Sequence, residues 1–519
     1  MTAIASRARI PDAAVSRRHL RAHLPFLILL LAAIALRVVA TLGYPSVFWF
    51  GDSNGYLTRG LVPAPSPLRP AGYSLLLWLL KPFHSFTVVV AVQHALGLLT
   101  GALVYAAIWR VSRRRAEKTG SESARTPGSA PGPTPGPTPG PTPGSAPGRT
   151  PGPAPGFATG LVATLAAAPC LLDVHQLALE QLLMSDTLFV FLIVAAVTVP
   201  LCFASLPWWA GIPLGLILGA ASITRTLGLA VAAILVAWFL VRRAGLRLVA
   251  STLAALALAL AAYAGWYHSA RGQFALTGSN GIFLYNRTAA FADCRIIKPP
   301  ARLQRLCRDD AAHRPGVAPG FYVLWSKDSP FRHIGGGIGG ARANELAGDF
   351  AKAAIKAQPG DYVRVVAEDV VRGFTWHRGT YPTRGTVRSY HFPGKMKIPA
   401  EARANAGAYA PGSASPHRVE PFASWIRTYQ RVAVWPGIFI AVALLIGLVG
   451  VIRRRRGTVT LPWLAALALL VGPPVVADFD YRYLLPVVPL SLLAAALTWV
   501  ERPAKWRMSR SEAARSSYT

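Results

Sequence analysis

The stretch LPFLILLLAAIALRVVATLGYPSVFWFGDSNGY, residues 24–56, decides the fold of this chain. It begins with an apolar run over residues 24–42, close to the roughly 20 residues that a helix needs to cross a bilayer. Asp52 follows almost directly, and residues 69–80, RPAGYSLLLWLL, continue as an amphipathic segment. A carboxylate at the edge of a bilayer is costly to keep and tends to mark a functional site. The sequence therefore predicts a membrane protein with a functional site near its first outward loop.

The rest of the chain repeats the apolar pattern. Hydrophobic residues make up 53% and charged residues 15% of the 519 residues, which is too apolar for a soluble protein. Runs near membrane length occupy residues 24–42, 86–109, 157–172, 182–204, 207–222, 227–241, 248–268, 431–452, 459–477 and 483–500. We therefore predict a polytopic α-helical membrane protein with about ten transmembrane helices. The run at 157–172 is short, and 207–241 is interrupted by Arg225, which leaves a re-entrant pair as the alternative there.

Basic residues in the short loops indicate the orientation, because Lys and Arg near the ends of spans stay cytoplasmic. With ten spans, the basic clusters all fall on one side, at residues 7–21, 110–118, 242–247, 453–456 and 502–510. Both termini are then cytoplasmic, and Asp52 faces outward. The preference for Arg over Lys, with heavy use of Ala, Gly and Pro, suggests a GC-rich bacterial genome, so we expect a multi-pass protein of the inner (plasma) membrane. The first run lacks a convincing cleavage site, so we expect an uncleaved anchor.

The chain divides into three predicted parts. Residues 1–268 form an N-terminal transmembrane module, residues 269–430 an extracytoplasmic domain, and residues 431–519 the last helices and a basic tail. Residues 119–156 repeat Pro and Gly without apolar residues to bury, which predicts a disordered cytoplasmic linker.

The predicted extracytoplasmic domain has no membrane-length run, and we expect it to be mixed but mostly helical. Apolar residues recur at intervals of three and four within 343–377, which indicates two amphipathic helices separated by Gln358-Pro359-Gly360-Asp361. The glycine-rich run at 335–340 lacks the Lys-Ser or Lys-Thr of a phosphate-binding loop and is expected to be a flexible loop.

Cysteine usage fits an oxidising compartment on the outward side. Cys294 and Cys307 both lie in the predicted extracytoplasmic domain, so we expect them to form a disulfide. Closing a loop this short stabilises a fold by roughly 3 kcal/mol in the chain-entropy model. Cys170 and Cys202 lie in predicted spans, where we expect free thiols that act as small apolar groups.

The formal net charge of +32 does not indicate a nucleic-acid partner. Much of the excess is the topological signal described above, and no nucleic-acid-binding module is recognisable. Anionic membrane lipids or a lipid phosphate are the partners that this charge favours.

Polar residues next to the predicted spans come from separate loops and helix ends. They are Asp52, Arg59, Arg69, Tyr73, Asp173, His175, Glu180, Asp186, Arg225, Asp478, Asp480, Tyr481, Arg482 and Tyr483. Within predicted spans, Arg37 is expected to snorkel or face the site, and His94 to be a satisfied interior histidine.

Transfer of a sugar from a lipid phosphate would use such residues. A cation must hold the leaving phosphate as charge accumulates there, and a carboxylate must take the proton of the acceptor hydroxyl. Asp52 suits the second role, and Arg225 and Arg482 suit the first.

Five short segments together resemble a known family. They are Asp52 in the first outward loop, R-P-x-G-Y at 69–73, LLMSDTLFVFL at 182–192, SITRTLGLA at 222–230 and DYRYLLPVVPL at 480–490. This set resembles the polyprenyl-phosphate-sugar-dependent glycosyltransferases of the GT-C superfamily, nearest to the protein mannosyltransferase and aminoarabinose transferase branch. The resemblance covers residues 20–268 and 431–500, and it implies a GT-C-like fold.

The resemblance also implies site residues. Asp52 matches the acid that serves as catalytic base, and Arg69 with Tyr73 match a surface-helix segment. Asp186 stands where the pattern usually has Glu. Arg225 matches an Arg at the outer end of a middle span, and Arg482 matches the Arg of a late R-Y-x-x-P motif. Arg59 and Tyr481 complete the predicted substrate-binding set.

The sequence departs from the family pattern in two places. Ser53 follows Asp52 where a second acid would make a paired-carboxylate site, and residues 269–430 have no counterpart that we can assign.

We therefore expect a membrane glycosyltransferase that moves a sugar from a polyprenyl-phosphate donor to an unidentified extracytoplasmic acceptor. No metal site is assigned; a divalent metal held by Asp52, Asp173, His175 and Glu180 is an alternative. Two other functions are alternatives as well. One is a transporter or flippase of a lipid-linked or envelope substrate, whose intramembrane charges would line a path. The other is a non-catalytic scaffold of envelope assembly.

Overall fold

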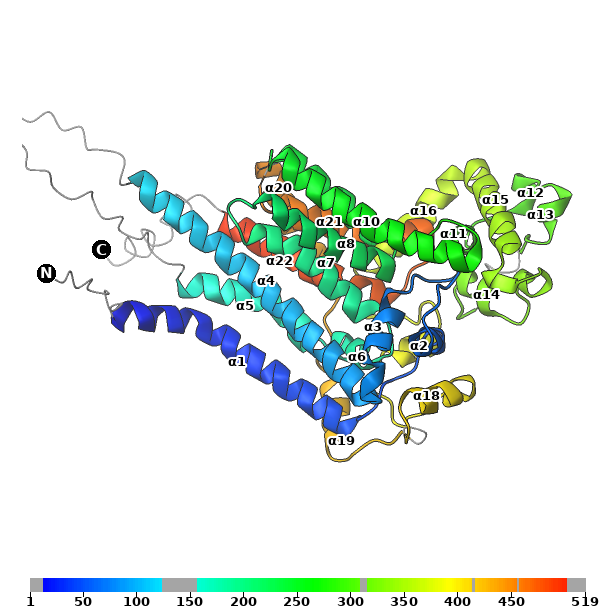
Figure 1. The fold of residues 1–519 in the computed structure, drawn as a ribbon, viewed down its shortest axis with the longest axis horizontal. Helices are drawn as coiled ribbons and strands as arrows, with labels where there is room; N and C mark the ends of the chain where they lie inside the picture. Colours follow the sequence, from blue (N-terminus) through cyan, green and yellow to red (C-terminus); the bar gives the residue numbers. More distant parts are fainter. Residues whose placement is uncertain (1–12, 124–155, 309–314, 413–415, 455–456, 502–519) are drawn as a thin grey trace, which may run out of the picture.

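The structure is a computed structural model, and it describes residues 13–123, 156–308, 315–412, 416–454 and 457–501 (Figure 1). These residues form α-helices α1–α22 and no β-strand, apart from two isolated bridges that join Phe48 to Leu182 and Val317 to Thr383. The predicted linker falls mainly outside the described residues, at 124–155, while residues 119–123 continue a helix. The first basic cluster, residues 7–21, lies partly outside the described residues, and the last, residues 502–510, lies wholly outside them.

Four helical segments are long and apolar enough to cross a membrane. They are Leu20–Gly43 of α1 (Ala13–Gly43), Phe86–Lys118 of α4 (Phe86–Ser123), α10 (Leu246–Arg271), and Tyr481–Val500, which contains α22 (Val487–Val500). A fifth arises if α5 (Phe157–Leu172) and α6 (Val174–Gln181), bent by 45°, count as one broken span. Apolar side chains such as Leu31, which is 67% exposed, cover their outer faces. The protein is therefore all-helical with four to five helices suited to a membrane.

Shorter apolar helices occupy the other predicted runs. They are α7 (Asp186–Leu201), α8 (Gly211–Thr224), α9 (Gly228–Val241), α20 (Ile438–Arg453) and α21 (Thr460–Val476). Each of the ten predicted runs thus coincides with a helix, but about half of these helices are shorter than a full span.

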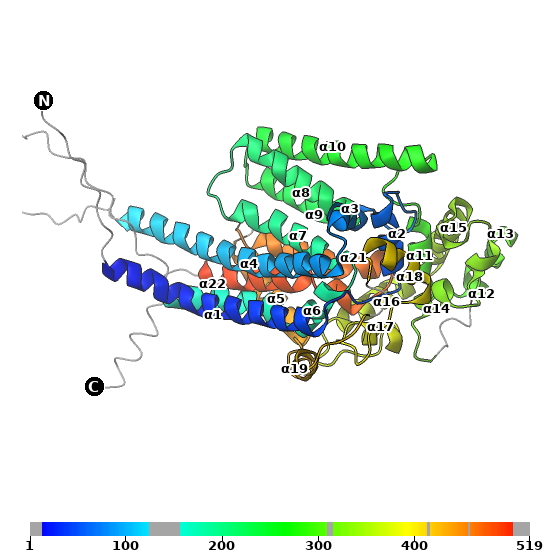
Figure 2. The same cartoon turned by 60° about the horizontal axis from the view of Figure 1, so that its bottom comes forward.

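Close packing of α8 against α10 explains the glycine spacing in α8. A Cβ atom on Gly215 would lie 2.3 Å from the backbone oxygen of Thr252, and one on Gly211 would lie 2.6 Å from that of Leu248. Small residues four apart let apolar helices approach to backbone contact. The two helices lie side by side in both views (Figures 1 and 2).

Helices joined by turns and loops make up the described part of residues 269–430, in line with the predicted mostly helical character. Their helices are α11 (Asn280–Thr288), α12 (Cys294–Ile297), α13 (Ala301–Gln304), α14 (Pro319–Trp325), α15 (Ala341–Ala357), α16 (Pro359–Arg372), α17 (Arg384–Ser389), α18 (Arg403–Tyr409) and α19 (Phe422–Tyr429). The predicted pair of amphipathic helices is confirmed as α15 and α16. The glycine-rich run holds a short 3₁₀ turn, Gly337–Gly339. The three-to-four spacing of the apolar residues explains the helical form of α15 and α16.

This region contributes to two separate hydrophobic cores. Residues from Ile282 to Val365 form a core of their own, and α11–α15 lie at the far end of the molecule from the C-terminal end of α4 (Figures 1 and 2). Residues from Tyr390 to Ile426 instead join the main core of the apolar helices. The second half of the region therefore packs directly against the elements that carry Asp52.

Candidate functional site

Asp52 lies immediately before α2 (Ser53–Leu61), yet its side chain makes no capping hydrogen bond to that helix. Its Oδ1 lies 2.7 Å from Arg69 Nη2, and its Oδ2 lies 3.5 Å from Arg482 Nη1. The Asp52 side chain is 10% exposed. Residues far apart in the chain thus converge on one carboxylate, which is the arrangement that the sequence predicts for Asp52 and Arg482.

The loop between α2 and α3 (Gly72–Leu80) positions Arg69. Residues 62–70 contain four prolines, whose fixed φ angles favour an extended chain and exclude a helix. Gly72 then packs against the end of α8, where a Cβ atom would lie 2.8 Å from the oxygen of Ile223. The glycine of the R-P-x-G-Y segment is therefore needed for docking α3 onto α8, and that docking fixes Arg69 beside Asp52.

Arg482 is held on the other side of Asp52 by aromatic rings and an acid. Its guanidinium lies 4.9 Å from the ring centre of Phe50 and 5.3 Å from that of Tyr483. Its Nε lies 3.3 Å from Asp480 Oδ2, an ion pair without hydrogen-bond geometry. Tyr390 donates its hydroxyl hydrogen bond to both oxygens of Asp480 at 2.7 Å. Burial raises the pKa of the Asp480 carboxyl, and the nearby Arg482 partly offsets that rise.

Arg225 pairs with a different acid. Its Nη2 donates to Asp186 Oδ2 at 2.6 Å, and its Nε donates to Ser185 Oγ at 3.2 Å. The tight turn between α8 and α9 places it there, since a Cβ atom on Gly228 would lie 2.6 Å from Ser222 N. Arg225 therefore neutralises Asp186 and does not contact Asp52.

Two side chains connect this second ion pair to the first. Tyr483 has the guanidinium groups of both Arg225, at 5.6 Å, and Arg482, at 5.3 Å, over its ring. Tyr56 follows Asp52 on α2, and its hydroxyl lies 3.1 Å from the same Ser185 Oγ that Arg225 contacts. The arrangement gathers three arginines and three aspartates in one neighbourhood.

A cavity with an empty volume of about 430 Å³ opens beside Asp52. Arg59, Arg69 and Tyr56 line it together with the proline-rich loop. Burial, reinforced by the neighbouring Arg271, lowers the pKa of Arg59, so its positive charge lies in an unfavourable environment. A cavity whose two cations face one carboxylate is suited to an anionic ligand.

Of the predicted substrate-binding residues, Arg59 and Arg69 line this cavity, whereas Tyr73, Asp186, Arg225, Tyr481 and Arg482 do not. Tyr73 is fully buried and donates its hydroxyl hydrogen bond to Gln93 Oε1 at 2.8 Å. The hydroxyl of Tyr481 accepts a hydrogen bond from the backbone N–H of Gly379 at 2.7 Å. Both hydroxyls are thus committed to protein partners.

Tyr481 instead lines a second, narrow cavity between the α5–α6 break and the start of α20. Arg378, which the sequence did not single out, lies 3.7 Å from Asp173 in its wall. His175 Nε2 and Trp435 Nε1 are buried there without a hydrogen-bond partner. This cavity offers hydrogen-bond donors from side chains that the Asp52 site does not use.

The residues proposed for a metal site do not converge. Glu180 is fully buried and is bound by Arg37 through both oxygens, at 2.8 and 2.9 Å, and by His94 at 2.8 Å. Arg37 is 3% exposed, so the prediction that it snorkels or faces the site is wrong. Its remaining donors reach the backbone oxygens of Ala33 and Leu171, which removes any need for headgroup contact. Among the described residues, no group of three His, Cys, Asp or Glu side chains is placed to hold a metal ion.

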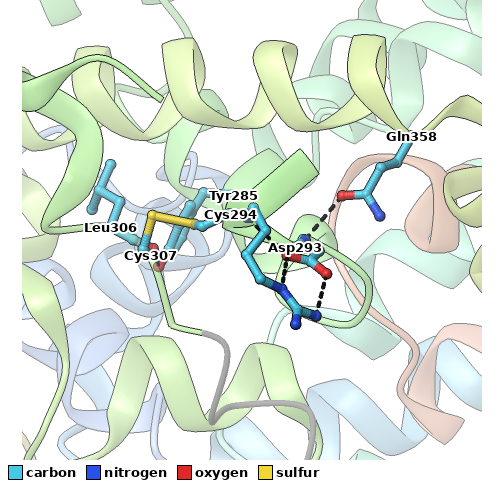
Figure 3. Close-up of a disulfide and its surroundings, with 7 residues drawn as sticks. Tyr285, Asp293, Cys294, Leu306, Cys307 and Gln358 are labelled. Atoms are coloured by element: carbon cyan, nitrogen blue, oxygen red, sulfur yellow. Dashed lines mark hydrogen bonds and ion pairs between the residues drawn. A yellow bond between two sulfur atoms is a disulfide. The ribbon is translucent and has the colours of Figure 1, made fainter. Parts of the chain in front are cut away.

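The predicted disulfide between Cys294 and Cys307 is confirmed (Figure 3). It links the start of α12 to the chain after α13, with the two Cα atoms 6.0 Å apart. Tyr285 donates its hydroxyl hydrogen bond to the backbone oxygen of Leu306 at 2.7 Å, beside the bridge. The disulfide therefore stabilises the separate core of α11–α16 and lies away from Asp52.

Sequence reasoning missed Phe50, Ser185 and Tyr390, which orient the arginines and Asp480. Phe50 and Ser185 stand inside or beside the quoted motifs and could have been found by their proximity to Asp52 and Asp186. Tyr390 comes from a region without a recognisable motif.

Comparison with protein-family models, with curated proteins and with solved structures finds no match for this chain. Its function must therefore be argued from the geometry of the site. That geometry provides a carboxylate with a weakly occupied oxygen, flanked by guanidinium groups next to apolar helices. It is suited to binding a phosphate and to accepting a proton.

Proposed function

We propose that the protein is a membrane glycosyltransferase of the GT-C kind, which moves a sugar from a polyprenyl-phosphate donor to an extracytoplasmic acceptor. The observation that carries the proposal is the position of Asp52 between Arg69 and Arg482, 10% exposed and facing a basic cavity. Guanidinium groups match phosphate oxygens in geometry and charge, and apolar helices offer a surface for a polyprenyl chain.

The proposal places all ten apolar helices in the inner membrane, with the shorter ones shielded by their neighbours. Basic residues at the ends of α4, α9 and α20 would then be cytoplasmic, and Asp52, at the other end, extracytoplasmic. Residues 269–430 would form an outward layer over the site, where an acceptor would be recognised.

In the proposed reaction, Arg69 and Arg482 hold the phosphate of the donor. The acceptor hydroxyl attacks the anomeric carbon while the bond from that carbon to the phosphate oxygen breaks, and the electron pair leaves with the phosphate. Asp52 Oδ2 takes the hydroxyl proton. This oxygen is suited to the role because its contact with Arg482 is long, at 3.5 Å, and a carboxylate oxygen has lone pairs to spare. Arg225, neutralised by Asp186, would orient Tyr483 and not hold the phosphate directly.

The test is a transfer assay with the full chain in liposomes supplied with radiolabelled carrier-linked sugar. We expect wild-type protein to move label from the carrier to acceptors in an envelope extract. Asp52→Asn should lower the rate by about 10²- to 10⁴-fold, the usual contribution of a general base. Glu117→Gln, a carboxylate that pairs with Arg113 near the C-terminal end of α4, is the control and should leave the rate unchanged.

Two outcomes would contradict the proposal. Undiminished transfer by Asp52→Asn would remove its proposed catalytic base. Movement of intact carrier-linked sugar across the bilayer, without transfer, would identify a transporter or flippase.

A further inference from the structure

A hollow with an empty volume of about 1780 Å³ lies at the opposite end of the helices from Asp52. α4 shows the separation: Phe86, at its start, stacks on Tyr409 near α2, whereas Arg114 lines the hollow. The two residues are 28 positions apart, which corresponds to roughly 40 Å of helix at 1.5 Å per residue. α10 runs the other way, from Leu248 in the hollow to Arg271, which donates to the backbone of Pro65.

The hollow is strongly basic. Its charged lining consists of Arg114, Arg115, Lys118, Arg242, Arg243, Arg454 and one acid, Glu501. Glu501 accepts a hydrogen bond from the hydroxyl of Thr458. Within the described residues, the wall of this hollow therefore carries a surplus of five positive charges.

Apolar side chains line the same hollow. Phe203, Phe239 and Trp238 contribute to the wall, and the guanidinium of Arg242 lies 4.9 Å from the Trp238 ring centre. Arg114 donates from Nη2 to the backbone oxygen of Leu201, but its Nε is buried without a partner. The hollow thus combines an unmet hydrogen-bond donor, excess positive charge and an apolar surface.

This combination goes beyond what orientation in a membrane requires. The topological rule needs basic residues near the ends of spans, but it does not need them to face a common space. Arg113, Arg247 and Arg453 satisfy that rule from α4, α10 and α20 without lining the hollow. The cations of the hollow come from other positions on the ends of α4, α9 and α20.

We propose that this hollow binds the phosphate headgroup of an anionic phospholipid. Its location favours a lipid, because it lies at the ends of α4 and α10, both long enough to cross a bilayer, where headgroups would be. The cations contact the phosphate, and the aromatic side chains contact the start of the acyl chains. Basic pockets between helices on the cytoplasmic side are suited to such headgroups. The inference does not rest on the proposed transferase function.

The experiment is native mass spectrometry of the full chain, released from neutral detergent and titrated with phosphatidylglycerol or phosphatidylcholine. The test variant is Arg114→Gln/Arg242→Gln/Arg454→Gln. The matched control is Arg113→Gln/Arg247→Gln/Arg453→Gln, which removes the same charge from comparable helix ends. Because Arg114 also bonds to Leu201, a second variant, Arg242→Gln/Arg454→Gln, leaves that hydrogen bond in place.

We expect wild-type protein and the control to retain phosphatidylglycerol in preference to phosphatidylcholine. Both test variants should bind phosphatidylglycerol at least about tenfold more weakly than wild type, because each cation near the membrane surface contributes to anionic lipid binding. Equal losses in the test and control variants would overturn the proposal, since surface charge alone would then explain binding. It would also be overturned if inorganic phosphate at the same concentration displaced the lipid, because the hollow would then be a site for free phosphate.

Discussion

Glu180 and Asp52 both have cationic partners, and they differ in how fully they are bound. Glu180 receives four hydrogen bonds, two from Arg37 and one each from His94 and Gln176, all between 2.8 and 3.0 Å. Asp52 has one close guanidinium contact, at 2.7 Å, and one long contact, at 3.5 Å. An ionised carboxylate has about four acceptor positions.

This difference separates a structural cluster from a candidate functional one. The Glu180 carboxylate is saturated and fully buried, and it ties α1, α4 and α6 together with no position left for a ligand. The Asp52 carboxylate faces a cavity and has acceptor positions to spare. Residue types alone do not distinguish the two clusters, since both combine an acid with arginine.

The largest effect on stability is expected at the saturated cluster. Glu180→Ala leaves the Arg37 guanidinium buried without its counter-charge, which should cost about 3–5 kcal/mol of unfolding free energy. Thermal unfolding in detergent, with Asp52→Asn as the comparison, measures this difference. If Asp52→Asn proved as destabilising as Glu180→Ala, the division into a structural and a functional cluster would be wrong.

A third ion cluster is expected to respond to pH. Arg287 bonds to Asp369 and lies 3.9 Å from Asp478, joining α11 and α16 to the loop before α22. Burial raises the pKa of Asp478 from 3.8 to about 6, so the folded protein holds this proton more tightly than the unfolded chain. The stability from this group is therefore full below about pH 4 and is lost as the pH rises through about 6.

Raising the pKa of Asp478 from 3.8 to about 6 corresponds to roughly 3 kcal/mol of unfolding free energy. Asp478→Asn should remove this part of the pH dependence, whereas Glu345→Gln, an exposed control, should not. Melting temperatures between pH 4 and 8 measure it. Identical pH profiles for wild type and Asp478→Asn would contradict the assignment.

The smallest effect is expected at Tyr73, whose ring packs edge-on against Tyr56 of the Asp52 site. Tyr73 on α3 donates to Gln93, and Gln93 donates to the backbone oxygen of Glu180 at 2.7 Å. Tyr73→Phe removes one buried hydrogen bond and should cost about 1 kcal/mol. Thermal unfolding and transfer kinetics should show lower stability with an unchanged KM. A raised KM would support the sequence-based prediction that Tyr73 binds substrate.

The helices could be predicted from the sequence because their signal is local. Each apolar run has the length and composition of a helix that packs in an apolar environment. In α15 and α16, apolar residues recur clearly at intervals of three and four. The lengths of the spans were harder to predict. α5 ends at Leu172, where Asp173 begins the bend into α6, and the turn at Arg225 limits α8 to 14 residues.

The site could be predicted only in part because ion pairing depends on tertiary packing. Short motifs named Asp52, Arg69 and Arg482, which the fold brings together, but grouped Arg225 with Asp52 as well. They could not show that Arg225 pairs with Asp186, or that Arg37 pairs with Glu180. The sequence offers several acids as partners for each arginine, and only the packing of the helices selects one. Tyr390 donates a hydrogen bond to Asp480, but the sequence around Tyr390 contains no motif that would have pointed to this contact.

The most direct test of the central claim is binding of polyprenyl phosphate to the full chain in nanodiscs. If the Asp52 cluster holds a lipid phosphate, Arg69→Gln/Arg482→Gln should weaken binding by at least about tenfold, the effect of losing charge-assisted hydrogen bonds. Asp52→Asn should bind at least as tightly as wild type, because its arginines are released from the carboxylate. Undiminished binding by the arginine variant, or loss of binding by Asp52→Asn, would contradict the account.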